Sequence, residues 1–442
     1  METRRIIVHS LVLIMTLSAS SAQASNTILT PQTFNELRDA YLSDPAAFQE
    51  KLIEVRKAGH QGLDFYFALR QSKPPLPLQE SELLDALCAQ KDCEFSHLFW
   101  YTDFEQAKQA AQRTGRPILA LHLLGKLSDE HSCANSRYFR SVLYADDGVK
   151  QALRDDFILY WKSVREVPLI SIDFGDGRKL ERTITGNSIH YVLDLDGQVV
   201  DAIPGLYGPD RFLSIIQGAR TVALGLPKQQ LNREFILRKF HEAQSRWIRR
   251  RWSDQLGDPL RLATLKDASA ASSKNGTGSG AIRASFKALT KALSEERLFE
   301  RLGYPMVDQL KSITSDADWH TLASRPLNEV RLSDGSLALI KKQNAAISDI
   351  QSLVKNLEKS IALDQVRNEY LIQSTIHAWL ESEPAPELNQ LNERVYRELF
   401  LTPLNDPWMG LLQNEVYFAL PSNGAFEQQK ALEPGVKEGN NV

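Results

Sequence analysis

Strand-like and helix-like patterns of apolar residues follow one another in the second quarter of the chain. Residues 118–124 read ILALHLL, a continuous apolar run that predicts a central strand buried on both faces. Residues 157–164 (FILYWKSV) predict the next strand. Two shorter apolar runs, 191–193 and 199–202, flank the sequence DLDG at 194–197, which predicts a hairpin turn.

Amphipathic segments separate these strands. Asp103 can cap a helix that ends at Gly115, residues 134–143 predict a second helix, and Pro209 opens a last one. Asp146 or Asp147 caps a further helical turn before the second strand. The resulting order, α-β-α-β-β-α, predicts an α/β domain. The sequence DFGDG at 173–177 predicts an added β-hairpin within it.

The remainder of the chain is predicted to be mostly helical and to fall into distinct regions. These are a signal peptide (1–24), an N-terminal helical region (25–93), the α/β domain (94–226), an amphipathic helix (227–266), a flexible Gly/Ser/Ala linker (267–281), a helical C-terminal region (282–425) and a disordered tail (426–442).

The first 24 residues have the pattern of a secretory signal. Arg4 and Arg5 precede an apolar stretch at 6–17, and the sequence AQA at 22–24 offers a cleavage site after Ala24. The apolar stretch is short for a bilayer span, and an uncleaved anchor is the alternative. The sequence therefore predicts a periplasmic or secreted protein.

Composition narrows the classes of function. The chain has 442 residues, of which 43% are hydrophobic and 24% charged, as in ordinary soluble globular proteins. The net charge of −3 provides no basic field for nucleic acid. Three cysteines are too few for a disulfide framework. The sequence contains no Gly-rich phosphate loop and no His-x-x-x-His or Cys-x-x-Cys pair, so no cofactor and no metal site are expected.

One cysteine stands where a strand's loop enters a helix. Counting from Ser136, an aromatic follows at eight residues (Tyr144), a valine at thirteen (Val149), and Phe157 opens the next strand. These spacings resemble the thioredoxin-like superfamily, in particular its exported members, over about residues 94–226. The resemblance implies a thioredoxin-like central domain with Cys133 at the nucleophilic position and Ser136 at the resolving position.

The segment departs from that family at two functional positions. The motif Cys133-Ala134-Asn135-Ser136 is a monothiol, and Ile189 stands at the position of the family's cis-proline. A thiol at a helix N-terminus is still favoured as thiolate, and His131 could stabilise that charge. Without a second cysteine, an external thiol must release any mixed disulfide.

Two functions therefore stay open, and with them the question of whether the protein is an enzyme. The first is monothiol thiol-disulfide exchange, oxidoreductase-like or isomerase-like, on periplasmic protein thiols through Cys133. The alternative is a non-catalytic interaction or scaffold protein whose helical C-terminal region binds a protein partner.

The other two cysteines, Cys88 and Cys93, lie just before the predicted domain. In an oxidising compartment they can form a local structural disulfide. Alternatively, they form a redox pair that resolves adducts on Cys133.

Several further residues favour structural roles. Four aspartates are explained by hairpin turns rather than by metal binding: Asp173, Asp176, Asp194 and Asp196. His122 and His190 lie in strands and are expected in the core. Glu369, His377 and Asp406 could form an acid-base set, but their spacing does not require it.

The amphipathic helix carries a basic segment, Arg246–Trp252. Its predicted role is to dock on the domain with a solvated basic face, and the alternative is contact with anionic lipid or an acidic partner. The predicted apolar stripe consists of Ile236, Phe240, Ala243 and Trp247.

Overall fold

The computed structural model describes residues 29–70, 76–183, 187–226, 230–256, 323–324, 326–400, 402–408 and 419–424. By its internal contacts the chain divides into Met1–Ala58 and Gly59–Val442. The predicted signal peptide, linker and tail (1–24, 267–281 and 426–442) lie outside the described residues. Among the helices described, none is long and apolar enough to span a bilayer.

The first unit contains two helices with matching starts. Helix α1 (Pro31–Ser43) is capped by Thr30, whose hydroxyl accepts from the backbone N–H of Thr33, and α2 (Pro45–Arg56) is capped by Asp44. Both helices begin with proline, which tolerates the first helical turn because its missing N–H would have no partner there. Their facing apolar side chains are buried, Phe34 and Leu37 among them.

The second unit is a mixed α/β structure built on a five-stranded sheet. The strands are β1 (Trp100–Tyr101), β2 (Ile118–Leu124), β3 (Ile158–Arg165), β6 (Ile189–Leu193) and β7 (Val199–Pro204). Their order is β1-β3-β2-β6-β7. Strand β3 pairs in parallel with both β1 and β2, and β6 pairs antiparallel with both β2 and β7. All seven residues of β2 are buried, as its unbroken apolar run predicts.

Helices cover both faces of this sheet. The segments that pack around it are α6 (Phe104–Thr114), α7 (Ala134–Tyr138), the π-helical turn η1 (Phe139–Leu143), α8 (Asp147–Asp156) and α9 (Pro209–Gly225). Two adjacent residues of β6 point to opposite faces of the sheet. His190 lies between the rings of Phe139 and Phe212, whereas the Tyr191 hydroxyl donates to Asn392 of the C-terminal region.

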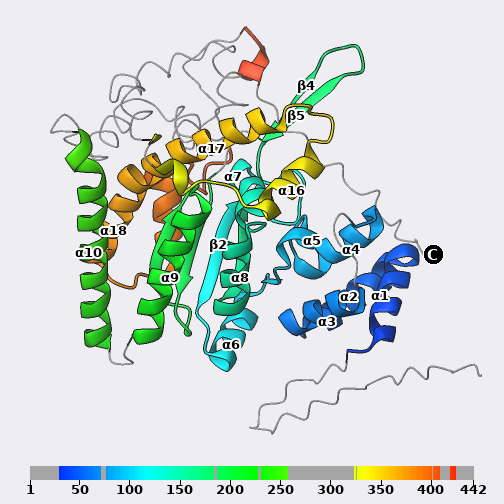
Figure 1. The fold of residues 1–442 in the computed structure, drawn as a ribbon, viewed down its shortest axis with the longest axis horizontal. Coiled ribbons are helices and arrows are strands. Elements are labelled where there is room, and N and C mark those ends of the chain that lie inside the picture. Colours follow the sequence, from blue (N-terminus) through cyan, green and yellow to red (C-terminus); the bar gives the residue numbers. More distant parts are fainter. Residues whose placement is uncertain are drawn as a thin grey trace, which may run out of the picture. The chain divides into compact units, whose positions relative to one another are not determined.

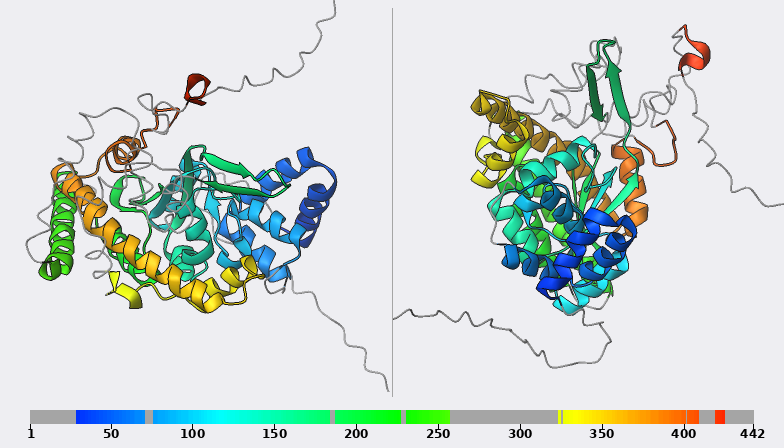
Figure 2. Two further views of the ribbon diagram at one scale, coloured as in Figure 1. Left: turned by 90° about the horizontal axis from the view of Figure 1, so that it is seen from above. Right: turned by 90° about the vertical axis from the view of Figure 1, so that its right-hand side faces the viewer.

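The predicted hairpin is present as a separate two-stranded sheet. Strands β4 (Leu169–Asp173) and β5 (Lys179–Thr183) pair antiparallel, and most of their side chains are exposed. Figure 2 shows this ribbon projecting from the body of the unit.

The remaining described elements are helical. They are α3 (His60–Arg70), α4 (Leu78–Cys88), α5 (Cys93–Ser96), α10 (Gln230–Leu256), η4 (Pro326–Asn328), α16 (Asp334–Gln343), α17 (Ile350–Arg367), η5 (Asn368–Gln373), α18 (Ser374–Ser382), α19 (Leu388–Arg394), η6 (Val395–Leu399) and η7 (Pro421–Gly424). Helices α10 and α18 pack along each other (Figure 1).

The C-terminal region is packed tightly against the sheet domain. A Cβ at Gly205, which has φ of +73°, would lie 2.5 Å from the Asn368 side chain. The amide of Asn368 donates to the Leu206 carbonyl, and the Gly208 N–H donates to Gln365. The predicted regions 94–226 and 282–425 therefore share one unit. By internal contacts the chain divides after Ala58, and the predicted 93/94 boundary stays a prediction.

The predicted apolar stripe of α10 is one residue out of register. Ile236 and Trp247 are substantially exposed, and the buried positions are instead Leu237, His241 and Ile248. The buried face also carries Arg233, which pairs with Asp194 at 2.6 Å. The buried face of α10 also contains polar residues that have partners. The positions of apolar residues alone therefore do not locate this face correctly.

Candidate functional site

Cys133 lies at the N-terminus of α7, where the loop after β2 turns into the helix. Its Sγ is 3.2 Å from the hydroxyl of Ser136 and 3.0 Å from the hydroxyl of Ser188. Ser136 also donates to the Cys133 carbonyl at 2.9 Å. The structure thus joins two predicted site residues and adds Ser188, which the sequence analysis missed. The signal for it was available, because Ser188 directly precedes Ile189, the predicted cis-proline position.

His131, predicted to stabilise the thiolate, is turned elsewhere. Its side chain is 47% exposed, and its Nε2 lies 3.8 Å from a Glu181 carboxylate oxygen in β5. The loop before it is held from inside by buried Arg140, which donates to the carbonyls of Asp129 and Glu130. Because the loop is anchored in this way, the His131 side chain lies near the β4–β5 hairpin. The expected role of His131, which was to stabilise the Cys133 thiolate, is therefore not supported by its position.

The thiol of Cys133 is inaccessible to solvent. Cys133 is 0% exposed. Burial, and after it the neighbouring Cys133, raise the pKa of the Tyr144 and Tyr396 phenols well above their usual value. Tyr396 belongs to η6 and donates to the Asn187 carbonyl at 2.9 Å, and the Asn187 amide donates to Thr402 at 2.9 Å. The C-terminal region therefore closes the site.

Cys88 and Cys93 are joined by a disulfide that links the end of α4 to the start of α5. Asp85 accepts a hydrogen bond from the Cys93 N–H at 2.9 Å, and burial raises the pKa of this carboxyl to about 6. Both cysteines are buried. Within the described residues, no bond or hydrogen bond connects them to Cys133, and their action as a redox relay stays a prediction.

The aspartates singled out in the sequence serve turns. Asp173 and Asp176 each accept a backbone N–H two residues ahead, in the β4–β5 hairpin. Asp194 accepts from the N–H groups of Asp196 and Gln198 between β6 and β7. These contacts account for their spacing without a metal ion.

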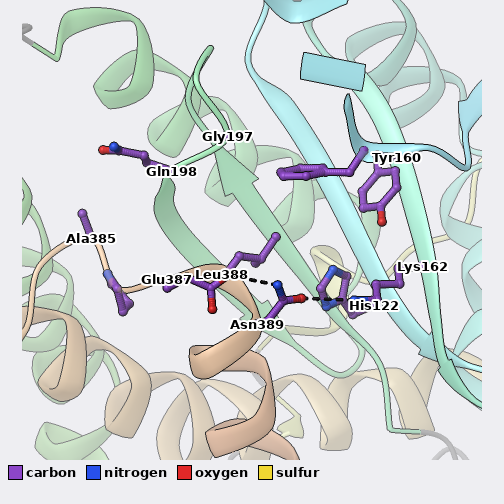
Figure 3. Close-up of a pocket in the computed structure, with 11 residues that line it drawn as sticks. His122, Tyr160, Lys162, Gly197, Gln198, Ala385, Glu387, Leu388 and Asn389 are labelled. Atoms are coloured by element: carbon purple, nitrogen blue, oxygen red, sulfur yellow. Dashed lines mark hydrogen bonds between the residues drawn. The ribbon is translucent and has the colours of Figure 1, made fainter. Parts of the chain in front are cut away.

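A groove of about 390 Å³ lies on the sheet face opposite α9. Figure 3 shows its polar edge, where Lys162 donates to Asn389 at 3.1 Å and Asn389 donates to Glu387 at 3.0 Å. The ring of His122 lies beside these bonds. Burial lowers the pKa of His122 to about 4, and neighbouring Asn392 opposes this shift. The groove thus combines a neutral aromatic floor with a charged rim.

The basic segment of α10 is largely paired within the protein. Arg246 pairs with Glu242, and Arg251 pairs with Glu329 at 2.7 Å. The Trp247 ring lies under the guanidinium groups of Arg211 and Arg251, at 4.2 and 4.9 Å from its centroid. These contacts fit the docking role predicted for the helix.

A second buried polar site lies between β7, α10 and α18. It consists of Asp201, His241 and His377, whose potential ligand atoms all lie within 4.8 Å of one another. The two Nδ1 atoms are 3.0 Å apart, and His377 Nδ1 is 3.7 Å from Asp201 Oδ1. Burial raises the pKa of Asp201 to about 7 and lowers that of His241 to about 3. Burial, followed by the fields of His241 and Arg211, lowers the pKa of His377.

This cluster was not predicted from the sequence. The sequence allowed an acid-base set of His377, Glu369 and Asp406 without requiring it. In the structure Glu369 pairs with Arg211, and the Asp406 carbonyl accepts from Arg165. No short spacing could reveal the cluster, because its members come from three distant segments. The available signal was His241, a histidine within an otherwise basic amphipathic helix.

The chain was compared with protein-family models, with curated proteins and with solved structures, and no match was found in any of the three.

Proposed function

We propose that this protein is exported and that its thioredoxin-like domain acts as a non-catalytic interaction module. The domain assignment is supported by the three parallel strands β1, β3 and β2, the antiparallel pair β6–β7, and the cysteine at the N-terminus of α7. The proximity of Ser188 to Cys133 supports the register in which Ile189 takes the cis-proline position. Export is supported by the residue pattern of positions 1–24.

The burial of Cys133 is the observation that carries the non-catalytic role. Disulfide exchange requires a thiolate that can approach a disulfide sulfur directly. Here the sulfur is 0% exposed, and its polar neighbours are hydroxyl groups of the protein itself. Ser136 at the resolving position leaves no local route to release an adduct.

The C-terminal region occupies space that an incoming substrate would need. Tyr396 and Thr402 hold the Asn187–Ser188 segment next to the sulfur through hydrogen bonds with Asn187. Both residues are fully buried. In this proposal the C-terminal region converts a reactive position into a packed core position.

Within the part of the chain that the structure describes, the groove of Figure 3 is the surface that we expect a partner to bind. Its floor offers aromatic rings, and its rim offers Lys162, Glu387 and Asn389. Aromatic anchors inside a polar rim are typical of surfaces that bind a peptide segment of another protein. A protein partner is therefore the ligand that this proposal expects.

Alkylation of the native protein tests the proposal. Iodoacetamide should modify Cys133 at least about 100-fold more slowly in the native protein than in denaturant. Intact mass should show one modification after denaturation without reductant, because the Cys88–Cys93 disulfide protects the other two thiols. Cys133→Ser is the control and should show none.

Fast alkylation of native Cys133, together with acid-trapped mixed disulfides, would overturn the non-catalytic role. It would favour monothiol exchange, which the helix N-terminus and the two hydroxyls beside the sulfur support as a second candidate. Tyr396→Ala distinguishes the two. If the C-terminal region is what blocks the thiol, this variant should alkylate faster than the wild type.

A further inference from the structure

The cluster of Asp201, His241 and His377 has the composition of a metal site. Two imidazoles and one carboxylate converge from β7, α10 and α18, and each residue is at most 2% exposed. Imidazole and carboxylate groups together are ligands of divalent transition metals such as zinc and iron. Calcium and magnesium instead prefer sets made of oxygen atoms.

The distances within the cluster are close to those between ligands of one ion. Zinc lies about 2.0–2.2 Å from nitrogen and oxygen ligands, so two ligands of one tetrahedral ion are about 3.3–3.6 Å apart. The observed separations are 3.0 Å between the two Nδ1 atoms and 3.7 Å between His377 Nδ1 and Asp201 Oδ1. Shifts of a few tenths of an ångström at these contacts would allow a shared ion.

The surroundings orient the ligands, and the nearby cation is already paired. The ring of His241 hydrogen-bonds the backbone of Val200, and Asp201 accepts from the Ala202 N–H at 2.8 Å. Second contacts of this kind fix ligand orientation at metal sites. The nearby Arg211 is paired with buried Glu369, so its positive charge is already compensated.

A hydrogen bond between the histidines is the alternative to a metal ion. One Nδ1–H would donate to the other Nδ1 across the same 3.0 Å. His377 Nε2 has no hydrogen-bond partner among the described residues, so this ring is engaged only through Nδ1. The alternative explains the pair of histidines, but it leaves the convergence of Asp201 as a third potential ligand without a role.

We propose that Asp201, His241 and His377 bind one Zn²⁺ ion, which fastens α10 and α18 to β7. The three elements come from segments far apart in the sequence, and α10 and α18 lie side by side (Figure 1). An ion bound at their junction stabilises the native fold, because the unfolded chain does not hold these ligands together. The role is structural, since none of the three side chains is accessible to a substrate in the closed fold.

Metal content and thermal stability of the full chain test this proposal. The protein purified without chelator, or stripped and then reloaded with ZnSO₄, should contain about one zinc per chain by mass spectrometry. Zn²⁺ should raise the Tm of the stripped protein, whereas equal Ca²⁺ should not. His241→Gln and His377→Gln should each weaken zinc binding at least about 100-fold.

His60→Gln is the matched control, because His60 is also a poorly exposed histidine of the same unit but lies outside the cluster. It should keep the zinc and the Tm response. If the His241 or His377 variants do not fold, X-ray absorption of the zinc-loaded wild type should still show two imidazole ligands. Absence of zinc after loading, no Tm shift, an equal shift with Ca²⁺, or a zinc spectrum without imidazole would each overturn the proposal.

Discussion

The two buried polar sites of this protein are assembled in different ways. In the thiol site, Cys133 and Ser136 lie one helical turn apart, and Ser188 is added from the residue that directly precedes strand β6. In the second site, His241 and His377 are 136 residues apart and meet only because α10 and α18 pack together. A short sequence motif therefore predicts the first site, whereas the residues of the second site come together only when the chain is folded.

The sites also differ in charge. The polar groups around Cys133 are hydroxyls, whose hydrogen bonds are individually modest. The Asp201–His241–His377 cluster lies beside Arg211 and the fully buried Glu369. Removing one partner of a buried ion pair is far more destabilising than removing a neutral hydrogen bond. Stability should therefore respond more strongly to mutations around the cluster than to mutations around the thiol.

The largest effect is expected from Glu369→Ala. This change leaves Arg211 in the interior without its carboxylate and removes a partner, at 3.7 Å, of Arg251. The free energy of unfolding should fall by about 3–5 kcal/mol, as measured by urea denaturation. Glu242→Ala is the control, because it breaks exposed ion pairs with Lys239 and Arg246 and should change stability little. Equal effects of the two variants would contradict the contrast in charge.

The next largest effect is a pH dependence carried by His122, a buried histidine outside both sites. Its pKa is about 4 in the folded protein against 6.5 ordinarily, so the unfolded chain binds the proton first as pH falls. The associated stability is present above pH 6.5 and is lost between pH 6.5 and 4, by about 3 kcal/mol at most.

Urea denaturation of the wild type and of His122→Gln across this pH range measures the contribution of His122 to the free energy of unfolding. The variant should lose less stability on acidification than the wild type. Comparing the two cancels groups with the opposite dependence, such as Asp201, whose pKa is raised. Parallel profiles for the wild type and His122→Gln would show that this ring titrates normally.

The smallest effect is expected at the thiol site. Ser188→Ala removes the hydroxyl 3.0 Å from the sulfur and should lower stability by about 0.5–1.5 kcal/mol. Ser136→Ala is the matched variant on the helix side, and it also removes a bond to the Cys133 carbonyl. A loss as large as that of Glu369→Ala would mean that the thiol site supports the fold as strongly as the charged site does.

Local elements followed closely from the sequence where one short segment contains all the information. Asp103 caps α6 by accepting from the Gln106 N–H, and Gly115 ends it in a left-handed conformation, as predicted. Strand β2 covers the predicted range 118–124. Caps, turns and continuous apolar runs act over a few residues, so their pattern is visible without the fold.

Predictions that depended on distant partners fared less well. The buried stripe of α10 is shifted by one residue because Arg233 pairs with Asp194 in the β6–β7 turn and His241 hydrogen-bonds the backbone of Val200 in β7. His131 faces Glu181 of the hairpin instead of Cys133. In each case the partner that decides the position of the side chain lies in another segment of the sequence.

The sequence by itself determined the α/β order of the central segment, the hairpin, and the place of Cys133 at a helix N-terminus. Only the tertiary structure decided that this thiol is buried beneath Tyr396 and that Asp201, His241 and His377 meet. The physical reason is range. Backbone hydrogen bonds and caps are satisfied between near neighbours, whereas burial and the convergence of polar side chains depend on which distant surfaces pack together.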